Sequence, residues 1–300
     1  MDATHLFTTH RPRLFGIAYR MLGTRGDAED VLQDAFVRWQ SVEHADLQSA
    51  EAWLVTVVTR LSIDRLRAAK TERAAYAGLW LPEPLVQAQH PVPPPEAMLE
   101  LCDDLSMAFL LLLERLAPEE RAALLMRQVF DHDYADIANL LNKTETACRQ
   151  LVHRARQRVK DGRQRFKVKA RDHRQLLEKF VAAARSGQRS DLMALLAADV
   201  QLMGDGGGKV ISVRKVLHGP DRVARLFHVV QRSHGANLHY SFAAINGEPG
   251  LLRWYGGAIE SALSIVTDGE RIRAIYVVRN PDKLRHIAES MVTSGQARAS

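Results

Sequence analysis

The hydrophobic pattern of the first 70 residues predicts three amphipathic helices. Apolar side chains recur at intervals of three and four residues over 14–22 and again over 31–39. Asp27 precedes the second run, where its carboxylate can cap the helix. A third helix is predicted over 49–69, with an apolar stripe on one side. Its other stripe is polar and carries Thr56, Arg60, Asp64 and Arg67.

A proline-rich stretch follows these helices. Residues 78–95 contain Pro82, Pro84, Pro91, Pro93, Pro94 and Pro95. Prolines at this density exclude a continuous helix or a central strand and favour an extended, semi-rigid linker. Trp80 and Leu81 are large apolar residues that need cover. Either the linker packs on its own domains, or it binds a partner segment.

Helical periodicity resumes at Glu96 and predicts a helix that ends near Leu116, followed by another that starts at Pro118. Two short helices then meet at a tight turn, in which Asn142 can end the first and Thr144 can cap the second. This arrangement predicts a helix-turn-helix. Its outward positions are Lys143, Thr144, Thr146, Arg149, Gln150, His153 and Arg154. Arginine, glutamine and threonine side chains can read base edges in a major groove.

The uneven distribution of charge changes this picture more than the net charge of +6 does. Residues 143–174 hold twelve basic and three acidic residues, which is a local net charge of +9. Residues 27–51 hold seven acidic residues against one arginine. A basic block of this density is typical of a phosphate-binding surface. A merely solvated helix face is the alternative, and the excess of one sign makes it less favoured.

The rest of the chain, from about residue 173, changes from helical to alternating periodicity. Helices are predicted over 175–186, 190–198 and 220–231. Period-two stretches lie at 200–203, 210–217, 238–245, 251–255, 258–266 and 271–278. Several strands with few helices before them predict an α+β domain in which a curved sheet wraps a cone.

Several classes of protein are disfavoured by what the sequence lacks. The longest apolar run, 107–113, is too short to cross a bilayer, and no secretory signal precedes it. Cys102 and Cys148 each lie on an apolar helical pattern, as small core residues of a reduced compartment do. Neither an HExxH motif nor a Cys/His cluster is present. We therefore expect a cytoplasmic protein with no metal, no cofactor and no membrane partner.

Three ordered motifs resemble bacterial RNA polymerase sigma factors of the extracytoplasmic-function class. The run 27–39 resembles the region of that class that binds core polymerase, and 52–67 resembles its −10 helix. Residues 119–134 and 153–156 resemble its −35 module. The resemblance covers about residues 6–160. It implies that the chain binds core RNA polymerase, double-stranded −35 DNA and a melted −10 element, with no covalent chemistry and no catalytic residue.

The resemblance also assigns the site residues. Core polymerase would contact Asp27, Asp30, Gln33 and Asp34. Thr56, Arg60 and Arg67 would follow a melted −10 strand, with Asp64 orienting the arginines. The −35 element would contact the seven outward residues of the helix-turn-helix. Trp53 could stack on a base, but a tryptophan on an apolar helix face is more often part of the core.

The last domain resembles the SnoaL-like family of cone folds, over about residues 173–285. The motifs 205–209 (Asp-Gly-Gly-Gly-Lys) and 280–284 (Asn-Pro-Asp-Lys-Leu), with 80–84 in the linker, resemble sigma factors whose fused SnoaL-like extension controls their activity. This predicts a regulatory contact formed by Trp80, Leu81, Pro82, Asp205, Gly206, Gly207, Gly208, Lys209, Asn280 and Pro281. A small apolar ligand could bind in the cone, and whether the extension inhibits or assists is left open.

The expected fold class is multidomain, with two all-α sigma modules, the second a helix-turn-helix, and a C-terminal α+β cone-shaped SnoaL-like domain. The expected boundaries are 1–72 for the first module, 73–97 for the linker, 98–168 for the second module and 173–290 for the cone. One alternative is a ligand-responsive helix-turn-helix regulator that acts without core polymerase. Another is a SnoaL-like enzyme fused to a DNA-binding module. Its acid–base candidates would be Asp199, Asp205, His218, His228 and His239, but no pair has a diagnostic spacing.

Overall fold

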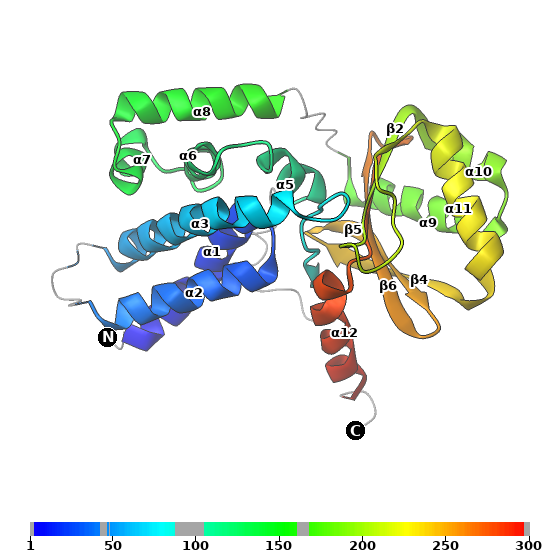
Figure 1. The fold of residues 1–300 in the computed structure, drawn as a ribbon, viewed down its shortest axis with the longest axis horizontal. Helices are drawn as coiled ribbons and strands as arrows, with labels where there is room; N and C mark the ends of the chain where they lie inside the picture. The colour runs from blue at the N-terminus through cyan, green and yellow to red at the C-terminus, as the bar shows by residue number, and fades with distance from the viewer. Residues whose placement is uncertain (1–2, 43–46, 48, 88–104, 161–167, 297–300) are drawn as a thin grey trace. The chain divides into compact units, whose positions relative to one another are not determined.

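The computed structural model describes residues 3–42, 47, 49–87, 105–160 and 168–296, which divide into two compact units (Figure 1). Unit 1 comprises Met1–Ala75 and Pro93–Gln164, and unit 2 comprises Tyr76–Val92 and Arg165–Ser300. Residues 76–87, the described part of the linker beyond Ala75, are therefore part of unit 2. The start of the helix expected from Glu96 lies outside the described residues. Cys102 and residues 161–167 of the basic block also lie outside them.

Unit 1 begins with three helices, α1 (Ala3–Leu22), α2 (Arg25–Gln40) and α3 (Ala50–Ala74). The apolar stripes meet in a core in which Ile17 and Leu54 are fully buried. Thr24, not Asp27, caps α2, because Thr24 has an extended backbone and its hydroxyl accepts a hydrogen bond from the Asp27 N–H at 3.3 Å. The predicted cap was thus displaced by three residues, which leaves the Asp27 carboxylate for another partner.

The second half of unit 1 contains the predicted helix-turn-helix. Its helices are α5 (Met107–Leu113), α6 (Pro118–Gln128), α7 (Tyr134–Leu141) and α8 (Glu145–Lys160). Asn142 ends α7 in the left-handed region, at φ 52°, and the Thr144 hydroxyl accepts from the Ala147 N–H at 3.2 Å. These local signals confirm the helix-turn-helix, whose inner face buries Ile137 and Cys148.

Unit 2 is built on one sheet with the strand order β1-β4-β5-β6-β7-β2-β3. The strands are β1 (Val86–Gln87), β2 (Leu196–Asp205), β3 (Leu217–His218), β4 (Leu238–Ile245), β5 (Glu248–Tyr255), β6 (Ala258–Thr267) and β7 (Ile272–Val278). The helices are α9 (Ala170–Ser186), α10 (Arg189–Leu195), α11 (Pro220–His234) and α12 (Pro281–Gln296). Strands β2 and β7 are parallel, and the other neighbours are antiparallel.

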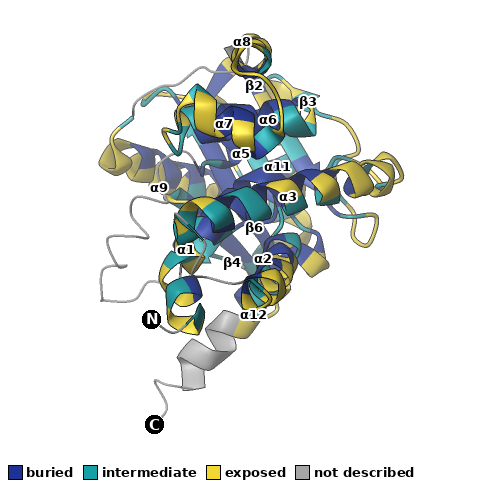
Figure 2. Ribbon diagram, turned by 90° about the vertical axis from the view of Figure 1, so that its left-hand side faces the viewer, coloured by how far each residue is buried: buried dark blue, intermediate teal, exposed yellow. Residues whose placement is uncertain are grey.

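Different helices lie against the two faces of this sheet. Leu251, Leu263 and Ile275 point to one face and join the core formed with α9 and α11, where Phe180 and Phe227 meet edge-to-face at 5.0 Å. Because side chains alternate along a strand, the neighbouring residues of these strands point to the opposite face. Figure 1 shows α12 on the other side of the sheet from α11, and Figure 2 shows buried and exposed residues on opposite sides of α9.

Two expectations for unit 2 need correction, and one helix was missed. The helix expected over 190–198 ends at Leu195, because β2 starts at Leu196 and pairs with β7. The strand expected over 210–217 is a loop up to β3, since Gly207 and Gly208 turn the chain at positive φ and the Arg279 side chain binds the Ile211 carbonyl. Helix α12 was not expected at all.

Candidate nucleic-acid interface and linker-binding site

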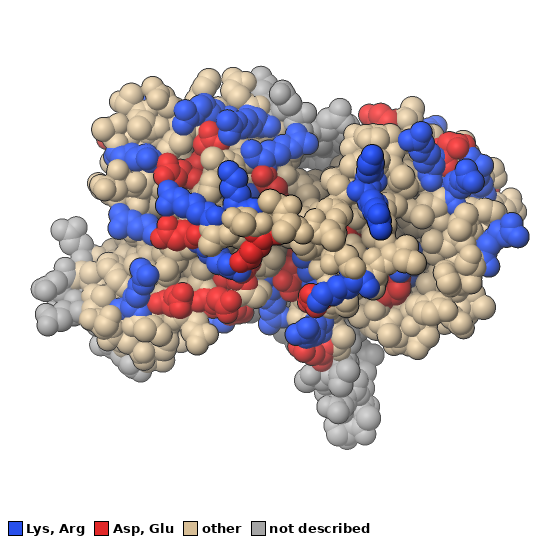
Figure 3. Space-filling view, viewed as in Figure 1, with Lys and Arg blue, Asp and Glu red and all other residues tan. Residues whose placement is uncertain are grey.

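The −35 candidates share the exposed side of the helix-turn-helix. Lys143, Thr144, Thr146, Arg149, Gln150, His153 and Arg154 are all exposed. Arg149 lies 2.7 Å from Glu145 and 4.5 Å above the centre of the Tyr134 ring, which holds its guanidinium at the surface. Figure 3 shows Lys and Arg side chains gathered over α8, with acidic side chains interspersed. The structure therefore brings these seven residues together on one basic face.

The −10 candidates on α3 are engaged within unit 1. Arg60 donates to the carbonyls of Leu140 at 2.8 Å and Asn139 at 3.0 Å, at the C-terminal end of α7. Carbonyls at that end carry the negative pole of the helix dipole, so they suit a guanidinium. Thr56 is half-buried, and its hydroxyl donates to the carbonyl of Ala52 at 2.8 Å.

Arg67, the other arginine among the −10 candidates, is also engaged within unit 1. Its guanidinium lies 2.8 Å from Glu119, at the start of α6, and 3.1 Å from Asp64. Glu119 also binds Lys143 of the −35 face at 3.1 Å. One carboxylate therefore contacts a −10 candidate and a −35 candidate at the same time. Asp64 does contact the arginine that it was expected to orient.

The structure separates the core-polymerase candidates on α2. Asp30, Gln33 and Asp34 are exposed. The Asp27 carboxylate instead binds the Arg65 guanidinium of α3 at 2.8 Å and has a side-chain exposure of 18%. This ion pair raises the pKa of Arg65, chiefly through the hydrogen bond to Asp27. Asp27 therefore has a partner inside unit 1.

Trp53 lies on the inner side of α3. It is half-buried, and its ring centre lies 5.5 Å from that of the buried Trp39. This placement fits the core role expected for Trp53.

In unit 2 the linker is bound by three residues that we call the linker-binding cluster, namely Asp205, Asn280 and Lys283. Asp205 is fully buried at the end of β2. Its carboxylate accepts hydrogen bonds from the Leu81 N–H at 3.0 Å and from the Tyr76 hydroxyl at 2.6 Å. The Lys283 ammonium lies 2.8 Å away. A buried carboxylate needs such donors, because its charge is costly to remove from water.

Lys283 and Asn280 complete the grip on the linker. The Lys283 ammonium donates to the Leu81 carbonyl at 2.5 Å and lies 4.2 Å from the centre of the Trp80 ring. The Asn280 amide donates to the Tyr76 hydroxyl at 2.8 Å. Burial and the hydrogen bond to Asp205 raise the pKa of Tyr76, so the phenol stays a neutral donor.

The linker itself is buried where it passes this cluster. Leu81, Pro82, Glu83 and Pro84 are all buried. Beyond them, Leu85 exchanges hydrogen bonds with Asn246, and β1 pairs with β4. Residues 81–87 are thus an integral part of unit 2.

The three glycines of the 205–209 motif lie where a side chain would collide with neighbouring atoms. Gly207 and Gly208 have φ of 62° and 71°. A Cβ on Gly207 would lie 2.4 Å from the Asn280 amide nitrogen, and one on Gly208 would lie 2.8 Å from Ala77 of the linker. Buried Gly206 would place a Cβ 2.4 Å from a backbone carbonyl oxygen.

The other motif residues expected at this contact lie at the surface. Lys209 binds Asp282 of α12 at 2.6 Å and not the linker, and Pro281 is exposed at the start of that helix.

Sequence reasoning did not name Tyr76 or Lys283 among the site residues. Lys283 stood inside a quoted motif, whereas nothing in the sequence marked Tyr76.

Comparisons with known proteins decide the family. The chain matches the models of Sigma-70 region 2 over residues 6–72 and Sigma-70 region 4 over residues 106–159. The ECF RNA polymerase sigma factor SigJ of Mycobacterium tuberculosis (strain ATCC 25618 / H37Rv) is 33% identical over 92% of this chain and 91% of its own. The chain belongs to the extracytoplasmic-function sigma factors. It therefore binds core RNA polymerase and promoter DNA, as the sequence predicted.

Two further similarities extend along the sigma factor. A probable sigma factor SigI from the same organism is 30% identical, covering 92% of each chain. The crystal structure of SigJ matches with a TM-score of 0.77 at 31% identity, covering 95% of this chain and 98% of that one. The SnoaL-like domain of this sigma factor matches that structure, so the expected fold class is confirmed.

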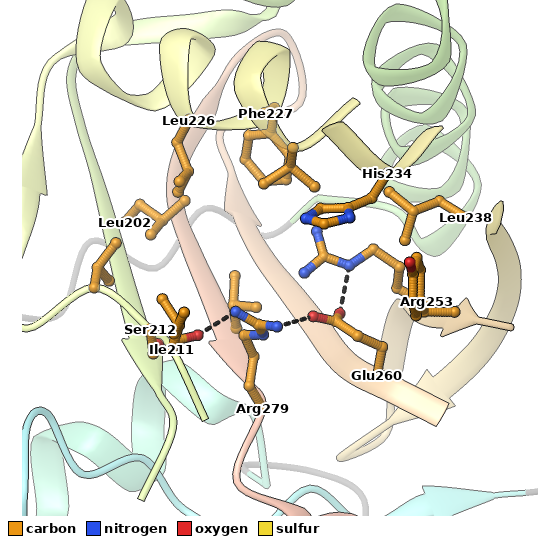
Figure 4. Close-up of a pocket in the computed structure, with 15 residues that line it drawn as sticks. Leu202, Ile211, Ser212, Leu226, Phe227, His234, Leu238, Arg253, Glu260 and Arg279 are labelled. Atoms are coloured by element: carbon orange, nitrogen blue, oxygen red, sulfur yellow. Dashed lines mark hydrogen bonds and ion pairs between the residues drawn. The ribbon is translucent and has the colours of Figure 1, made fainter. Parts of the chain in front are cut away.

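A cavity of about 400 Å³ lies inside the cone of the sigma factor, between the sheet and α11. Its apolar lining includes Leu202, Val213, Leu226, Phe227, Val230, Leu238 and Val277. Its charged lining residues are Arg253, Glu260 and Arg279, and Figure 4 shows them joined by a row of polar contacts.

The acid–base candidates do not line this cavity. Asp199 binds Arg273 at 2.9 Å, and Asp205 holds the linker. His228 lies 2.7 Å from the Gly187 carbonyl, while His218 and His239 are exposed on β3 and β4. The alternative in which these residues supply an acid–base pair inside the cavity therefore finds no support in their positions.

The described part of the chain also offers no evident metal site. No group of three or more His, Cys, Asp or Glu side chains lies close enough there to hold a metal ion. None of the described helices has the length and apolar character needed to cross a membrane.

Proposed function

We propose that the SnoaL-like domain regulates this sigma factor in cis by holding the linker between region 2 and region 4. The observation that carries the proposal is the buried Asp205 carboxylate, which binds Leu81, Tyr76 and Lys283 together. Two DNA-binding modules on one chain engage their sites together only when the linker between them spans the distance. A linker that is fixed at residues 76–87 has less free length with which to span it.

Burial makes this hold durable. The side chains of Lys283 and Asp205 are 8% and 0% exposed. The linker supplies two donors to this buried carboxylate, the Tyr76 hydroxyl and the Leu81 N–H, and a hydrogen bond to a charged group contributes about 1.5–3 kcal/mol. Burying the Leu81 side chain adds about 2 kcal/mol. The linker therefore stays bound until something acts on the cluster.

The exposure of the candidate side chains indicates which of them would contact the polymerase and which the −35 DNA. Asp30, Gln33 and Asp34 would contact core polymerase, while Asp27 fixes α2 to α3. The seven exposed residues of the helix-turn-helix would contact the −35 element. This sigma factor would act in the cytoplasm with the polymerase and carry out no covalent chemistry itself.

Thr56, Arg60 and Arg67 would bind the melted −10 strand once the contacts of the two arginines within unit 1 are exchanged for phosphates. Phosphate oxygens can replace carbonyl and carboxylate oxygens as acceptors of guanidinium hydrogen bonds. The contacts of Arg60 with α7 and of Arg67 with Glu119 would then break as region 2 engages DNA.

Transcription reconstituted with core polymerase tests the regulation. Full-length Asp205→Asn protein would be compared with wild type on promoters whose spacer is lengthened or shortened by single base pairs. We expect initiation to change by at least about fivefold and the spacer preference to broaden. Asp282→Asn, on an exposed residue of the same region, should leave both unchanged. An Asp205→Asn protein with wild-type activity and spacer preference would refute the proposal.

A further inference from the structure

The cavity in the cone contains a charged site that is formed at a β-bulge of the sheet. Arg253 pairs with Ser261 and Trp254 pairs with Ile259, so Glu260 is the extra residue of a bulge in β6. Regular alternation would send Glu260 to the opposite face from Ser261. The bulge turns it to the cavity instead, where it lies 2.6 Å from Arg253.

The charges in this site do not balance. Glu260 contacts Arg253 on one side and Arg279 on the other, so one carboxylate faces two guanidinium groups. Burial by itself would raise the pKa of Glu260, but Arg253, Ser261 and Arg279 together lower it, so the carboxylate is ionised. One positive charge is left over. Because the Arg253 side chain is only 6% exposed, water screens little of that charge.

The hydrogen-bonding capacity of the site is not used up either. A guanidinium has five N–H donors. Arg253 spends its Nε on Glu260 and also contacts the Tyr240 hydroxyl. The Nε of Arg279 is buried without a hydrogen-bond partner among the described residues. An acceptor placed at these arginines would therefore find donors ready.

Most of the remaining lining is apolar, and its other polar residues are Ser212, His234 and Tyr255. Figure 4 shows Leu226 and Phe227 of α11 on the side opposite the row formed by Arg279, Glu260 and Arg253. A volume of about 400 Å³ falls in the range of small-molecule sites. Ile211 lines the cavity from the loop, yet it is 89% exposed. An apolar side chain in that position gains cover when an apolar ligand enters.

We propose that the cone binds a small amphipathic monocarboxylate, whose carboxylate lies at Arg253 and Arg279 and whose apolar body lies against α11. The carboxylate neutralises the surplus charge and accepts hydrogen bonds from the guanidinium groups. A neutral apolar molecule would fill the cavity but leave the charge unbalanced. A cation would add to it.

Arg279 connects the cavity to the linker-binding cluster. The part of the inference that concerns the linker therefore rests on the proposed regulation in cis. The Arg279 side chain holds the Ile211 carbonyl, and its backbone N–H donates to the Asp205 carbonyl at 2.7 Å. Only five residues separate Asp205 from Ile211 in the loop. A ligand carboxylate competes with the Ile211 carbonyl for Arg279, so it loosens the loop whose first residue holds Leu81.

Three probes with the same chain and different head groups test the site. Octanoate, 1-octanol and octylammonium would be titrated into the full-length protein by isothermal titration calorimetry. We expect octanoate to bind at least about tenfold more tightly than the other two. Equal binding of octanoate and octanol, tighter binding of octylammonium, or no binding of octanoate would overturn the proposal.

Three variants locate the binding. Arg253→Met keeps Glu260 paired with Arg279 and should weaken octanoate about 10- to 100-fold while leaving octanol unchanged. Should that variant fail to fold, Ile211→Glu replaces an exposed side chain at the cavity and should also weaken octanoate by about tenfold. Val229→Glu, on an exposed residue of α11 that does not line the cavity, is its control and should bind octanoate as wild type does.

Amide hydrogen exchange at Leu81 tests the connection to the linker. Saturating octanoate should accelerate exchange of this amide by at least about threefold, because the Asp205 carboxylate that accepts its hydrogen bond becomes less fixed. Octanol should have no such effect. Unchanged exchange with bound octanoate would overturn the transmission. Failure of octanoate to bind, with transcription still altered by Asp205→Asn, would refute this inference and leave the proposed regulation standing.

Discussion

Units 1 and 2 each hold a basic side chain against a carboxylate in a contact to which we have assigned a role in transcription, but the two contacts are buried to very different degrees. In unit 1, Arg67 and Glu119 are 55% and 33% exposed. In unit 2, Lys283 and Asp205 are 8% and 0% exposed. The distances are the same, 2.8 Å in each pair. The exposure of the two pairs differs far more than their geometry.

The difference in burial decides how much free energy is needed to break each contact. An exposed ion pair contributes about 0–1 kcal/mol and is screened by salt, so a DNA phosphate can replace the carboxylate at little cost. A buried pair loses about 3–5 kcal/mol when one partner is removed. The contacts of Arg67 are therefore suited to exchange during promoter binding, whereas those of Asp205 are suited to holding the linker.

The largest predicted effect is that of removing the buried carboxylate. Asp205→Ala should lower the free energy of unfolding of unit 2 by about 3–5 kcal/mol, because Lys283 is left as an unpaired buried charge. Urea denaturation followed by circular dichroism measures the loss. Asp282→Ala removes the exposed partner of Lys209 and should cost under about 1 kcal/mol. Similar losses in the two variants would show that depth is not the deciding factor.

A second prediction contrasts the paired Asp205 with a partly buried carboxylate, that of Glu248, whose burial is not offset by an opposite charge among the described residues. Burial raises the pKa of Glu248 to about 7, so its ionisation destabilises the fold as the pH rises from about 5 to 7. Burial also lowers the pKa of His173 to about 4, and this group adds stability over the same rise. The two contributions oppose each other, which flattens the wild-type profile.

Glu248→Gln removes one of these opposing contributions. The variant should gain about 2 kcal/mol of stability relative to wild type between pH 5 and pH 7. Thermal unfolding of both proteins at the two pH values provides the measurement. Parallel pH profiles would contradict the role of Glu248.

A third prediction concerns the close approach at the glycine loop. Gly207 and Gly256 have similar positive φ of 62° and 57°, but a Cβ meets Asn280 at Gly207 and nothing within 4 Å at Gly256. Both alanine variants incur backbone strain of about 1 kcal/mol. Gly207→Ala should lose about 1–2 kcal/mol more in urea denaturation, because the Asn280 side chain must move. Equal losses would mean that the contact is soft.

The smallest effect on stability is predicted for the exposed pair of unit 1. Glu119→Gln should change the free energy of unfolding by less than about 1 kcal/mol. It should nonetheless tighten promoter binding by the polymerase holoenzyme, since it releases Arg67 and Lys143. Fluorescence anisotropy with labelled promoter DNA measures this, and Glu178→Gln, in an exposed pair of α9, is the control. Tighter binding by both variants would point to net charge alone.

Local signals explain why unit 1 could be predicted from sequence. The turn of the helix-turn-helix depends on Asn142 and Thr144, which act on backbone groups a few residues away. The cap of α2 was misplaced because Thr24 and Asp27 are both suitable residue types, and only the entry of the chain into the helix distinguishes them.

Unit 2 was predicted less completely because its decisive contacts join distant residues. Alternation over 210–217 is typical of a strand, but Arg279 holds Ile211 in a loop from 68 residues away. Tyr76 reaches Asp205 across 129 residues. The bulge at Glu260 has no signature in a single sequence, so the charged site of the cavity could not be predicted.

The pairing of β1 with β4 has a consequence for the state of the protein in solution. Strand β4 has β5 on one side and, among the described residues, only Val86 and Gln87 of the linker on the other. When the linker leaves, backbone N–H and C=O groups along β4 lose their covering strand, and such an edge is a template for another chain. We therefore expect release of the linker to favour self-association through this edge, which the short strand β1 otherwise covers.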